Sequence, residues 1–87
     1  MENSNVKVLV VDDENDFRLL MTFWLKSKGY KVISAGDGKT AVETAKLERP
    51  DIIFMDLRMP GMDGVEAVRR IREFHKTIPV IIMSALS

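Results

Sequence analysis

The chain has 87 residues, 46% of them hydrophobic and 30% charged, which is enough for one modest core and too little for two. Its 13 basic and 13 acidic residues give a formal net charge of zero, so no overall field favours nucleic acid or an anionic membrane. Cysteine is absent, which excludes disulfides and thiolate chemistry, and the polar start and short apolar runs fit neither a signal peptide nor a membrane span. We therefore expect one soluble, cytoplasmic domain.

Short continuous apolar runs alternate with segments of helical spacing, which is typical of βα units whose strands are buried on both faces. The fold class predicted is therefore α/β with a parallel sheet. Strands are expected at about Lys7 to Asp12, Tyr30 to Ala35, Asp51 to Asp56 and, after Pro79, Val80 to Met83. Helices are expected from near Asn15 to Gly29, around Ala41 to Ala45 with an end before Pro50, and from a capping box at Asp63 and Glu66 to about Phe74.

The helical spacing also predicts which side chains face the sheet. For the first helix the predicted inner residues are Phe17, Leu20, Met21, Trp24 and Leu25, and for the third they are Val65, Val68, Ile71 and Phe74. Leu19 and Phe23 form a separate apolar pair, four residues apart, on another face of the first helix. This pair has two interpretations, packing against a neighbouring element or docking a partner protein, and the sequence favours neither.

Polar side chains follow three of the predicted strands, namely Asp12 and Asp13 after the first, Asp56 at the end of the third and Ser84 after the fourth. In an open parallel sheet, ligands bind beyond the carboxyl ends of the strands, so these residues should share one rim. Mg²⁺ prefers near-octahedral oxygen coordination and keeps several waters, so it needs only one or two direct carboxylates. We expect Asp13 and Asp56 to bind the ion directly, Asp12 to contact it through water, and the backbone carbonyl of Arg58 to supply another oxygen.

A cation at this rim would screen an incoming phosphoryl group and allow a carboxylate to act as a nucleophile. Asp56 is the predicted nucleophile, because it stands alone at a central strand end before a loop rich in Pro and Gly. Ser84 would then donate a hydrogen bond to a phosphoryl oxygen. Taken singly, these residues have ordinary alternatives, such as helix capping for Asp12 and Asp13 or a turn for Asp56, but their placement at three strand ends favours the site.

At these residues the sequence resembles the receiver domain of two-component response regulators. The resemblance rests on Asp12-Asp13, Asp56, the loop Met59 to Gly64 and Ser84-Ala85, and it covers the chain from Lys7 onward. It implies a flavodoxin-like, doubly wound parallel sheet with strand order 2-1-3-4-5, and Mg²⁺-dependent transfer of a phosphoryl group to Asp56. The implied donor is a phosphohistidine on a sensor histidine kinase or phosphotransfer protein, which would dock on the first helix.

The resemblance further implies that Ser84 moves toward the new phosphate and switches the domain between an inactive and an active state. Such a domain is a signalling phosphoacceptor that assists its own phosphorylation and dephosphorylation, and it is not an enzyme with a separate substrate.

A receiver domain continues through a further helix, strand and helix, which carry its phosphate-binding lysine and switch aromatic, whereas this sequence reaches only Ser87. We therefore expect residues 1–87 to form part of one receiver domain, with residues 1–6 as a disordered N-terminus. The residues present should bind Mg²⁺, while efficient phosphotransfer and switching depend on residues beyond Ser87. With Val80 to Met83 as an open edge strand that could form one apolar surface with Leu19 and Phe23, we also expect the 87-residue chain to self-associate or to be only loosely folded.

Two other classes of function stay open. A Mg²⁺-dependent aspartyl-phosphate hydrolase would use similar chemistry, but haloacid-dehalogenase-like folds carry Asp-x-Asp at the end of the first strand, and position 14 is Glu. A receiver-like module that is never phosphorylated would use the same fold only as an interaction surface. Dinucleotide binding is disfavoured, because the turn from Asp12 to Asn15 is acidic and lacks glycine.

Overall fold

The computed structural model describes residues 5–83, and within them strands and helices alternate along the chain. The elements are β1 (Lys7–Val11), α1 (Asn15–Ser27), β2 (Lys31–Ala35), α2 (Gly38–Glu48), β3 (Ile52–Asp56), α3 (Gly64–Phe74) and β4 (Val80–Met83). All pairings are parallel, in the order β2-β1-β3-β4. The predicted α/β class and element order are therefore confirmed, and none of the described helices is long and apolar enough to span a membrane.

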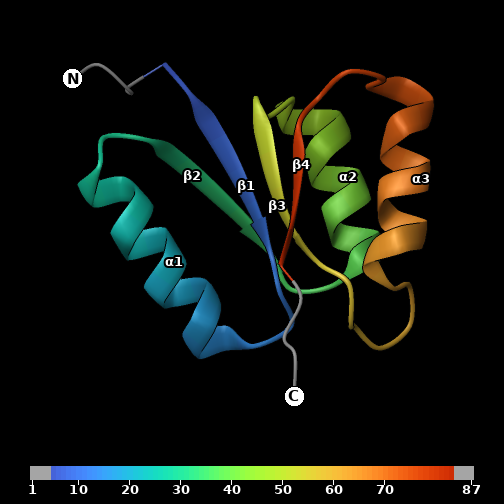
Figure 1. The fold of residues 1–87 in the computed structure, drawn as a ribbon, viewed down its shortest axis with the longest axis horizontal. Coiled ribbons are helices and arrows are strands. Elements are labelled where there is room, and N and C mark those ends of the chain that lie inside the picture. The colour runs from blue at the N-terminus through green and yellow to red at the C-terminus, as the bar shows by residue number, and fades with distance from the viewer. Residues whose placement is uncertain (1–4, 84–87) are drawn as a thin grey trace.

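The sheet lies between two helical layers, with α1 on one face and α2 and α3 on the other (Figure 1). Because side chains alternate along a strand, Leu9 and Ile53 belong to the core under α2 and α3, whereas Val8 and Val10 belong to the core under α1. Both faces of the central strands are thus buried. This explains why β1 and β3 appear in the sequence as continuous apolar runs.

The helix ends follow local signals in the sequence. Gly29, which the pattern places just after α1, has a positive φ of 97°, as expected for a helix-ending glycine. At the start of α3, the Asp63 side chain accepts a hydrogen bond from the Glu66 amide at 2.9 Å. The reciprocal half of the predicted capping box is replaced, because the Glu66 carboxylate forms ion pairs with Arg69 and Arg70. Those two bonds lower the pKa of the exposed Glu66 side chain to about 2.

The inner face of α3 agrees with the predicted one at Ile71, which is buried, and at Val68, which packs against the core, and differs elsewhere. Gly64, Ala67 and Ile71 are buried, whereas Val65, which the apolar pattern assigned to the core, is 64% exposed. Phe74 at the end of the helix is 39% exposed. The buried stripe is therefore made largely of small residues, which allow α3 to approach the sheet more closely than a stripe of valines would.

Gly64 shows how close that approach is. A Cβ atom at this position would overlap the carbonyl oxygen of Asp56 and lie 2.8 Å from the Cα atom of Leu57. The Gly64 amide also donates a hydrogen bond of 3.1 Å to the Leu57 carbonyl, which closes the β3–α3 loop. The start of α3 is thus packed directly against the backbone at the end of β3.

The α1 helix buries less of its apolar face than predicted. Leu25 is buried and Met21 packs partly against the core, but Leu20 and Trp24 are 64% and 53% exposed. Phe17 is 37% exposed. The reason is the position of α1, which contacts β1 and β2, so that no described helix covers the same sheet face over β3 and β4.

We expect Gly64→Ala to lower the free energy of unfolding by about 1–3 kcal/mol, because the added methyl group overlaps the backbone of Asp56. The neighbouring Val65→Ala, on the exposed side of the same helix turn, should change it by less than about 0.5 kcal/mol. Equilibrium unfolding in urea measures both values. A larger loss for Val65→Ala than for Gly64→Ala would contradict the observed orientation of α3.

Candidate functional site

Three carboxylates meet at the carboxyl ends of β1 and β3. The two strands are adjacent and parallel, with Val11 paired with Met55, so the residues that follow lie side by side. Asp12 and Asp13 come directly after β1, and Asp56 is the last residue of β3. One carboxylate oxygen from each of the three lies within 4.8 Å of the others. We call this group of Asp12, Asp13 and Asp56 the acidic rim.

Two members of the acidic rim are oriented by their own backbone. Asp12 Oδ1 accepts a hydrogen bond from the Glu14 amide at 2.9 Å, and Asp56 Oδ1 accepts one from the Arg58 amide at 3.0 Å. Each is a turn in which a carboxylate bonds the amide two residues ahead. Within residues 5–83, no hydrogen bond reaches the second oxygen of either carboxylate. One oxygen is therefore fixed while the other is available to a ligand.

The acidic rim is partly withdrawn from water. Asp12 and Asp56 are only 9% and 8% exposed, whereas Asp13 is exposed. Burial raises the pKa of Asp12 above its ordinary value of 3.8; the Glu14 amide opposes this effect, and the charges of Asp56 and Asp13 add to it. The ionised rim is thus electrostatically unfavourable without a positive charge nearby.

The donor set fits a hard divalent cation. Carboxylate oxygens are the ligands that Mg²⁺ prefers, and oxygens in one octahedral shell are about 3–4 Å apart. The spacing of up to 4.8 Å in the acidic rim exceeds this only slightly, so small side-chain movements, or one ligand acting through water, would complete the fit. The group contains neither histidine nor cysteine, so it does not suit a softer metal such as zinc.

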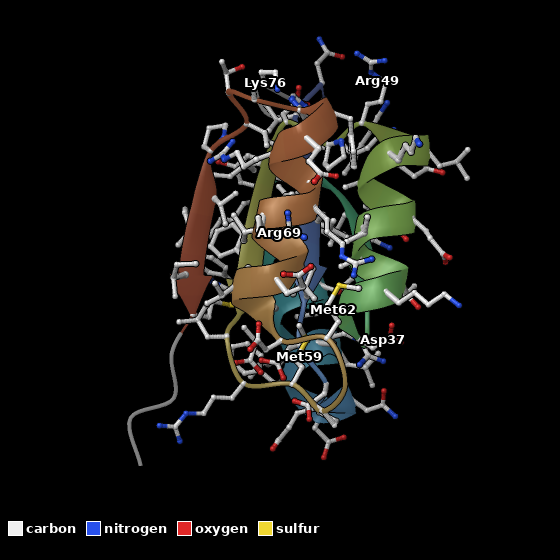
Figure 2. All side chains as sticks on the ribbon, turned by 90° about the vertical axis from the view of Figure 1, so that its right-hand side faces the viewer. Asp37, Arg49, Met59, Met62, Arg69 and Lys76 are labelled. Atoms are coloured by element: carbon white, nitrogen blue, oxygen red, sulfur yellow. The ribbon has the colours of Figure 1, made fainter. Side chains whose placement is uncertain are left out.

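The loop after β3 is anchored to the core by two of its methionines. Met59 is 7% exposed and belongs to the core, and Met62 packs against the same core between the sheet, α2 and α3. Figure 2 shows both methionines at the same end of the molecule as Asp37, whereas Arg49 and Lys76 lie at the opposite end. The loop that follows Asp56 is thus held by apolar packing as well as by the hydrogen bond from the Arg58 amide to the Asp56 carboxylate.

The remaining predicted site residues have different outcomes. Ser84 lies outside the described residues. Arg58 contributes its amide to the Asp56 carboxylate, an interaction that the sequence pattern does not predict. Leu19 and Phe23 are 69% and 74% exposed, so no described element packs over them.

Arg18 is a residue at the site that the sequence pattern does not single out. Its Nη1 atom donates a hydrogen bond of 2.8 Å to the backbone carbonyl of Asp12, six residues earlier. The sequence contains one weak signal for this contact. A cation near the start of a helix interacts unfavourably with the helix dipole, so an arginine at this position is expected to have another partner. Arg18 is the fourth residue of α1.

One apolar cavity in the described part of the molecule is remote from the acidic rim. It has a volume of about 640 Å³ and lies near the amino ends of the strands, lined by Val6, Trp24, Asp51, Phe54 and Pro79 among others. It is the space beside α1 that no described helix covers. Its apolar walls do not suit phosphate chemistry, so the acidic rim remains the candidate site.

The fold and the acidic rim together define a class of protein, the receiver-type α/β domain of two-component signalling. Comparison with known proteins agrees, because residues 8–87 match the family model of the response regulator receiver domain. The chain belongs to this family.

Individual relatives are similar over most of the chain. Sporulation initiation phosphotransferase F of Bacillus subtilis is 38% identical over 81 residues, which cover 93% of this chain and 65% of that protein. The alkaline phosphatase synthesis transcriptional regulatory protein PhoP of the same organism is also 38% identical, over 93% of this chain and 34% of that protein. The chain thus spans slightly less than two thirds of the first relative and about one third of the second.

Solved structures show the same fold. Chemotaxis protein CheY4 of Vibrio cholerae superposes with a TM-score of 0.90 at 34% identity, over 94% of this chain and 70% of that one. The response regulator domain of Thermotoga maritima CheB gives a TM-score of 0.85 at 40% identity, over 93% of this chain and 61% of that one. The flavodoxin-like receiver architecture predicted from the sequence is therefore confirmed.

We expect Asp12→Asn to stabilise the metal-free protein at pH 7. The native pKa of Asp12 lies above its value in the unfolded chain, so the native state binds more protons between the two values and stability falls as the pH rises through this interval. Asparagine removes the charge and keeps an oxygen for the Glu14 amide. Urea unfolding with a chelator should show a higher free energy of unfolding for the variant at pH 7. This gain should be lost below about pH 3.8, the pKa of Asp12 in the unfolded chain.

Asp37→Asn is the matched control. The Thr40 amide lowers the pKa of Asp37, so this carboxylate stabilises the protein above its ordinary pKa and loses that effect as the pH falls. Asp37→Asn should therefore give no gain at pH 7. Equal gains for both variants would show that the Asp12 effect is not specific to the acidic rim.

Proposed function

We propose that the protein is a Mg²⁺-dependent phosphoacceptor in a phosphorelay and that Asp56 is the residue that is phosphorylated. The observation that carries this proposal is the acidic rim, in which three carboxylate oxygens converge within 4.8 Å at the ends of adjacent strands. Membership of the receiver family supports it, because receiver domains are signalling modules. The sporulation relative is named a phosphotransferase, which is in keeping with phosphoryl chemistry.

The residues of the rim have separate roles in this proposal. Asp13 and Asp56 bind Mg²⁺ directly, Asp12 contacts it through water, and the Arg58 carbonyl supplies a further oxygen. When bound, Mg²⁺ offsets the charge of the rim and of the incoming phosphoryl group. The Arg58 amide holds Oδ1 of Asp56, which leaves the second oxygen of that carboxylate for the reaction.

The reaction follows from this arrangement. An oxygen of Asp56 attacks the phosphorus atom of a phosphohistidine, a P–O bond forms, and the P–N bond breaks with its electron pair returning to the imidazole nitrogen. The product is an acyl phosphate on Asp56 and a histidine that takes up a proton from solvent. The Ser84 hydroxyl donates a hydrogen bond to a phosphoryl oxygen and, by moving toward it, switches the domain to its active state.

The donor in this proposal is a sensor histidine kinase or a phosphotransfer protein. Leu19 and Phe23, exposed and one helical turn apart on α1, form the proposed docking pair for it. Their exposure favours docking over the alternative of packing within the described part of the domain.

Two alternatives use the same residues differently and are separated by one assay with a phosphodonor. Stoichiometric labelling supports the phosphoacceptor, repeated turnover of phosphate esters supports an aspartyl-phosphate hydrolase, and no labelling of a full-length version supports a module used only for interaction. The rim favours the phosphoacceptor over the hydrolase. Such hydrolases have their second aspartate where this chain has Glu14, which directly precedes α1 and donates its amide to the Asp12 carboxylate.

We expect Mg²⁺ to stabilise the protein in a saturable manner. If the unfolded chain does not bind the ion, a hundredfold excess over the dissociation constant raises the free energy of unfolding by about 2.7 kcal/mol. Asp13→Ala should abolish this gain, because it removes the exposed ligand while leaving the hydrogen bonds of Asp12 and Asp56 intact. Thermal unfolding with and without millimolar Mg²⁺ measures the effect, and identical curves for the unaltered chain would contradict the site.

A second prediction concerns the nucleophile and is tested on the full-length natural protein. Incubation with Mg²⁺ and a small phosphodonor should add one phosphate, which hydroxylamine removes because it is an acyl phosphate. Mass spectrometry should locate it at Asp56. Asp56→Asn keeps the oxygen that accepts the Arg58 amide but lacks a nucleophilic carboxylate, so the same labile label on this variant would refute the assignment.

We also infer that the 87-residue chain self-associates through its open sheet face. β4 is an edge strand of the described sheet; its Ile81, which pairs with Phe54 and shares its face on the α1 side, is 43% exposed, and the apolar cavity beside Trp24 opens on the same face. Burying such a surface against a second copy contributes about 25 cal/mol per Å², less the cost of association. Trp24 of α1 lines this cavity and belongs to the same surface.

Light scattering tests this inference. The unaltered chain should show a mass above that of the 9.9 kDa monomer at high concentration, and Ile81→Asp should shift it toward the monomer. Leu47→Asp, at an 81% exposed position on α2, is the control for adding a charge elsewhere. A compact monomer with a cooperative unfolding transition would contradict the inference.

A further inference from the structure

Arg18 is tied to the loop that carries two of the three rim carboxylates. Its Nη1 atom donates a hydrogen bond of 2.8 Å to the Asp12 carbonyl, and its Nη2 atom donates a short one to the Asn15 side chain. The Arg18 amide donates to the Glu14 carbonyl at 3.0 Å. Arg18 is half-buried, so its bond to the Asp12 carbonyl is partly shielded from water and constrains the loop more than an exposed contact would.

The bond from Arg18 completes the anchoring of Asp12. The Asp12 amide donates to the Ala35 carbonyl of β2 at 3.2 Å, and the Asp12 carboxylate accepts from the Glu14 amide. The carbonyl held by Arg18 belongs to the peptide unit that joins Asp12 to Asp13. Its orientation therefore sets the direction in which the chain enters Asp13.

Asp13 depends on that peptide unit more than its neighbours do. Its carboxylate is exposed and, within residues 5–83, accepts no hydrogen bond, whereas the carboxylates of Asp12 and Asp56 are each held by an amide. The backbone is thus what determines where the Asp13 carboxylate lies. Any group that fixes the Asp12–Asp13 peptide also places the exposed ligand of the acidic rim.

Gly36 provides the space for the guanidinium group. A Cβ atom built on Gly36 would lie 2.9 Å from Nη1 and 3.3 Å from Cζ of Arg18. The backbone of Gly36 does not require glycine, because among the described glycines only Gly29 and Gly61 have positive φ. The absence of a side chain at this position therefore serves the close approach of Arg18 to the end of β2.

We propose that Arg18 is a positioning residue that holds the Asp12–Asp13 peptide against β2 and thereby sets the affinity of the acidic rim for a divalent cation. The proposal rests on the proposed function, since it assumes that the rim binds a cation. Its guanidinium bonds the Asp12 carbonyl and, in the described part of the chain, none of the three carboxylates, so it does not compete with the cation for its ligands. It acts through the backbone, as second-sphere partners of metal ligands do.

The test measures Mg²⁺ affinity by isothermal titration calorimetry on the full 87-residue chain. Arg18→Ala should weaken binding about 10-fold, the lower end of the range for residues that orient metal ligands. Arg18→Lys should weaken it less, because lysine keeps the charge and one donor but does not bridge the Asp12 carbonyl and the Asn15 side chain together. Arg70→Ala, which removes an equal charge from an exposed position on α3, should change the affinity less than about 2-fold.

Gly36→Ala supplies an independent variant in which Arg18 keeps its charge. The added methyl group displaces the guanidinium, so binding should weaken several-fold. In the double variant, Gly36→Ala should add nothing to the effect of Arg18→Ala, since the two act through one contact. In metal-free NMR spectra, the amide signal of Asp13 should move in both single variants and stay in place in Arg70→Ala.

The outcomes separate this proposal from the function on which it rests. If the unaltered chain binds no Mg²⁺, the proposed function and the role of Arg18 are both wrong. If the unaltered chain binds Mg²⁺ and Arg18→Ala only lowers the melting temperature in chelator, with unchanged affinity and an unmoved Asp13 amide, Arg18 is merely structural and the proposal alone fails. If Arg18→Ala does not fold, unchanged affinity in both Arg18→Lys and Gly36→Ala refutes it equally.

Discussion

Electrostatic repulsion among three carboxylates is the constraint on which the arrangement of this domain depends. Asp12 and Asp56 are largely withdrawn from water, and Asp13 lies within reach of both, so that burial, together with the charges of Asp56 and Asp13, raises the pKa of Asp12. A structure that keeps such a group in place must hold the buried carboxylates by bonds that do not neutralise them. The backbone amides of Glu14 and Arg58 do this by fixing one oxygen of each buried carboxylate.

The rest of the fold keeps the strand ends from moving apart. Parallel pairing of β1 with β3 brings the residues after Val11 and Met55 together. The start of α3 packs on the Asp56 backbone through Gly64, and the loop between them is held by the apolar packing of Met59 and Met62. Rigid elements therefore bring the like charges together before any ligand arrives, which is the preorganisation that a cation site requires.

Much of this arrangement was predictable from the sequence, for identifiable reasons. Strands buried on both faces appear as continuous apolar runs, so β1 and β3 were evident. Ligands bind beyond the carboxyl ends of parallel strands, and this rule placed the aspartates of both strands on one rim. The inner faces of the helices were less predictable. Hydrophobicity favours Val65 as a core residue, whereas close packing against β3 requires the small residues Gly64 and Ala67. Similarly, the apolar face of α1 is broader than the part of the sheet that α1 covers, so Trp24 is half exposed.

Side-chain contacts to the backbone were not predictable, because they leave no periodic pattern. The bond from Arg18 to the Asp12 carbonyl spans six residues and depends on the exact path of the loop, and the reason for glycine at position 36 is visible only once the guanidinium is in place. The capping interaction at Asp63 was evident from the sequence, but the Glu66 carboxylate found stronger partners in Arg69 and Arg70. Competition of this kind between local partners is decided by geometry.

The central claim is that Asp12, Asp13 and Asp56 form a single site for a divalent cation. Titration with paramagnetic Mn²⁺, a close substitute for Mg²⁺ with oxygen ligands, tests it most directly by NMR. Substoichiometric Mn²⁺ should broaden the amide signals of residues 12–14 and 56–58 first, while those of Lys7 and Asp51 at the opposite strand ends stay sharp. Broadening centred on other acidic residues, such as Asp37 or Asp51, with residues 12–14 and 56–58 unaffected, would show that the three carboxylates do not form this site.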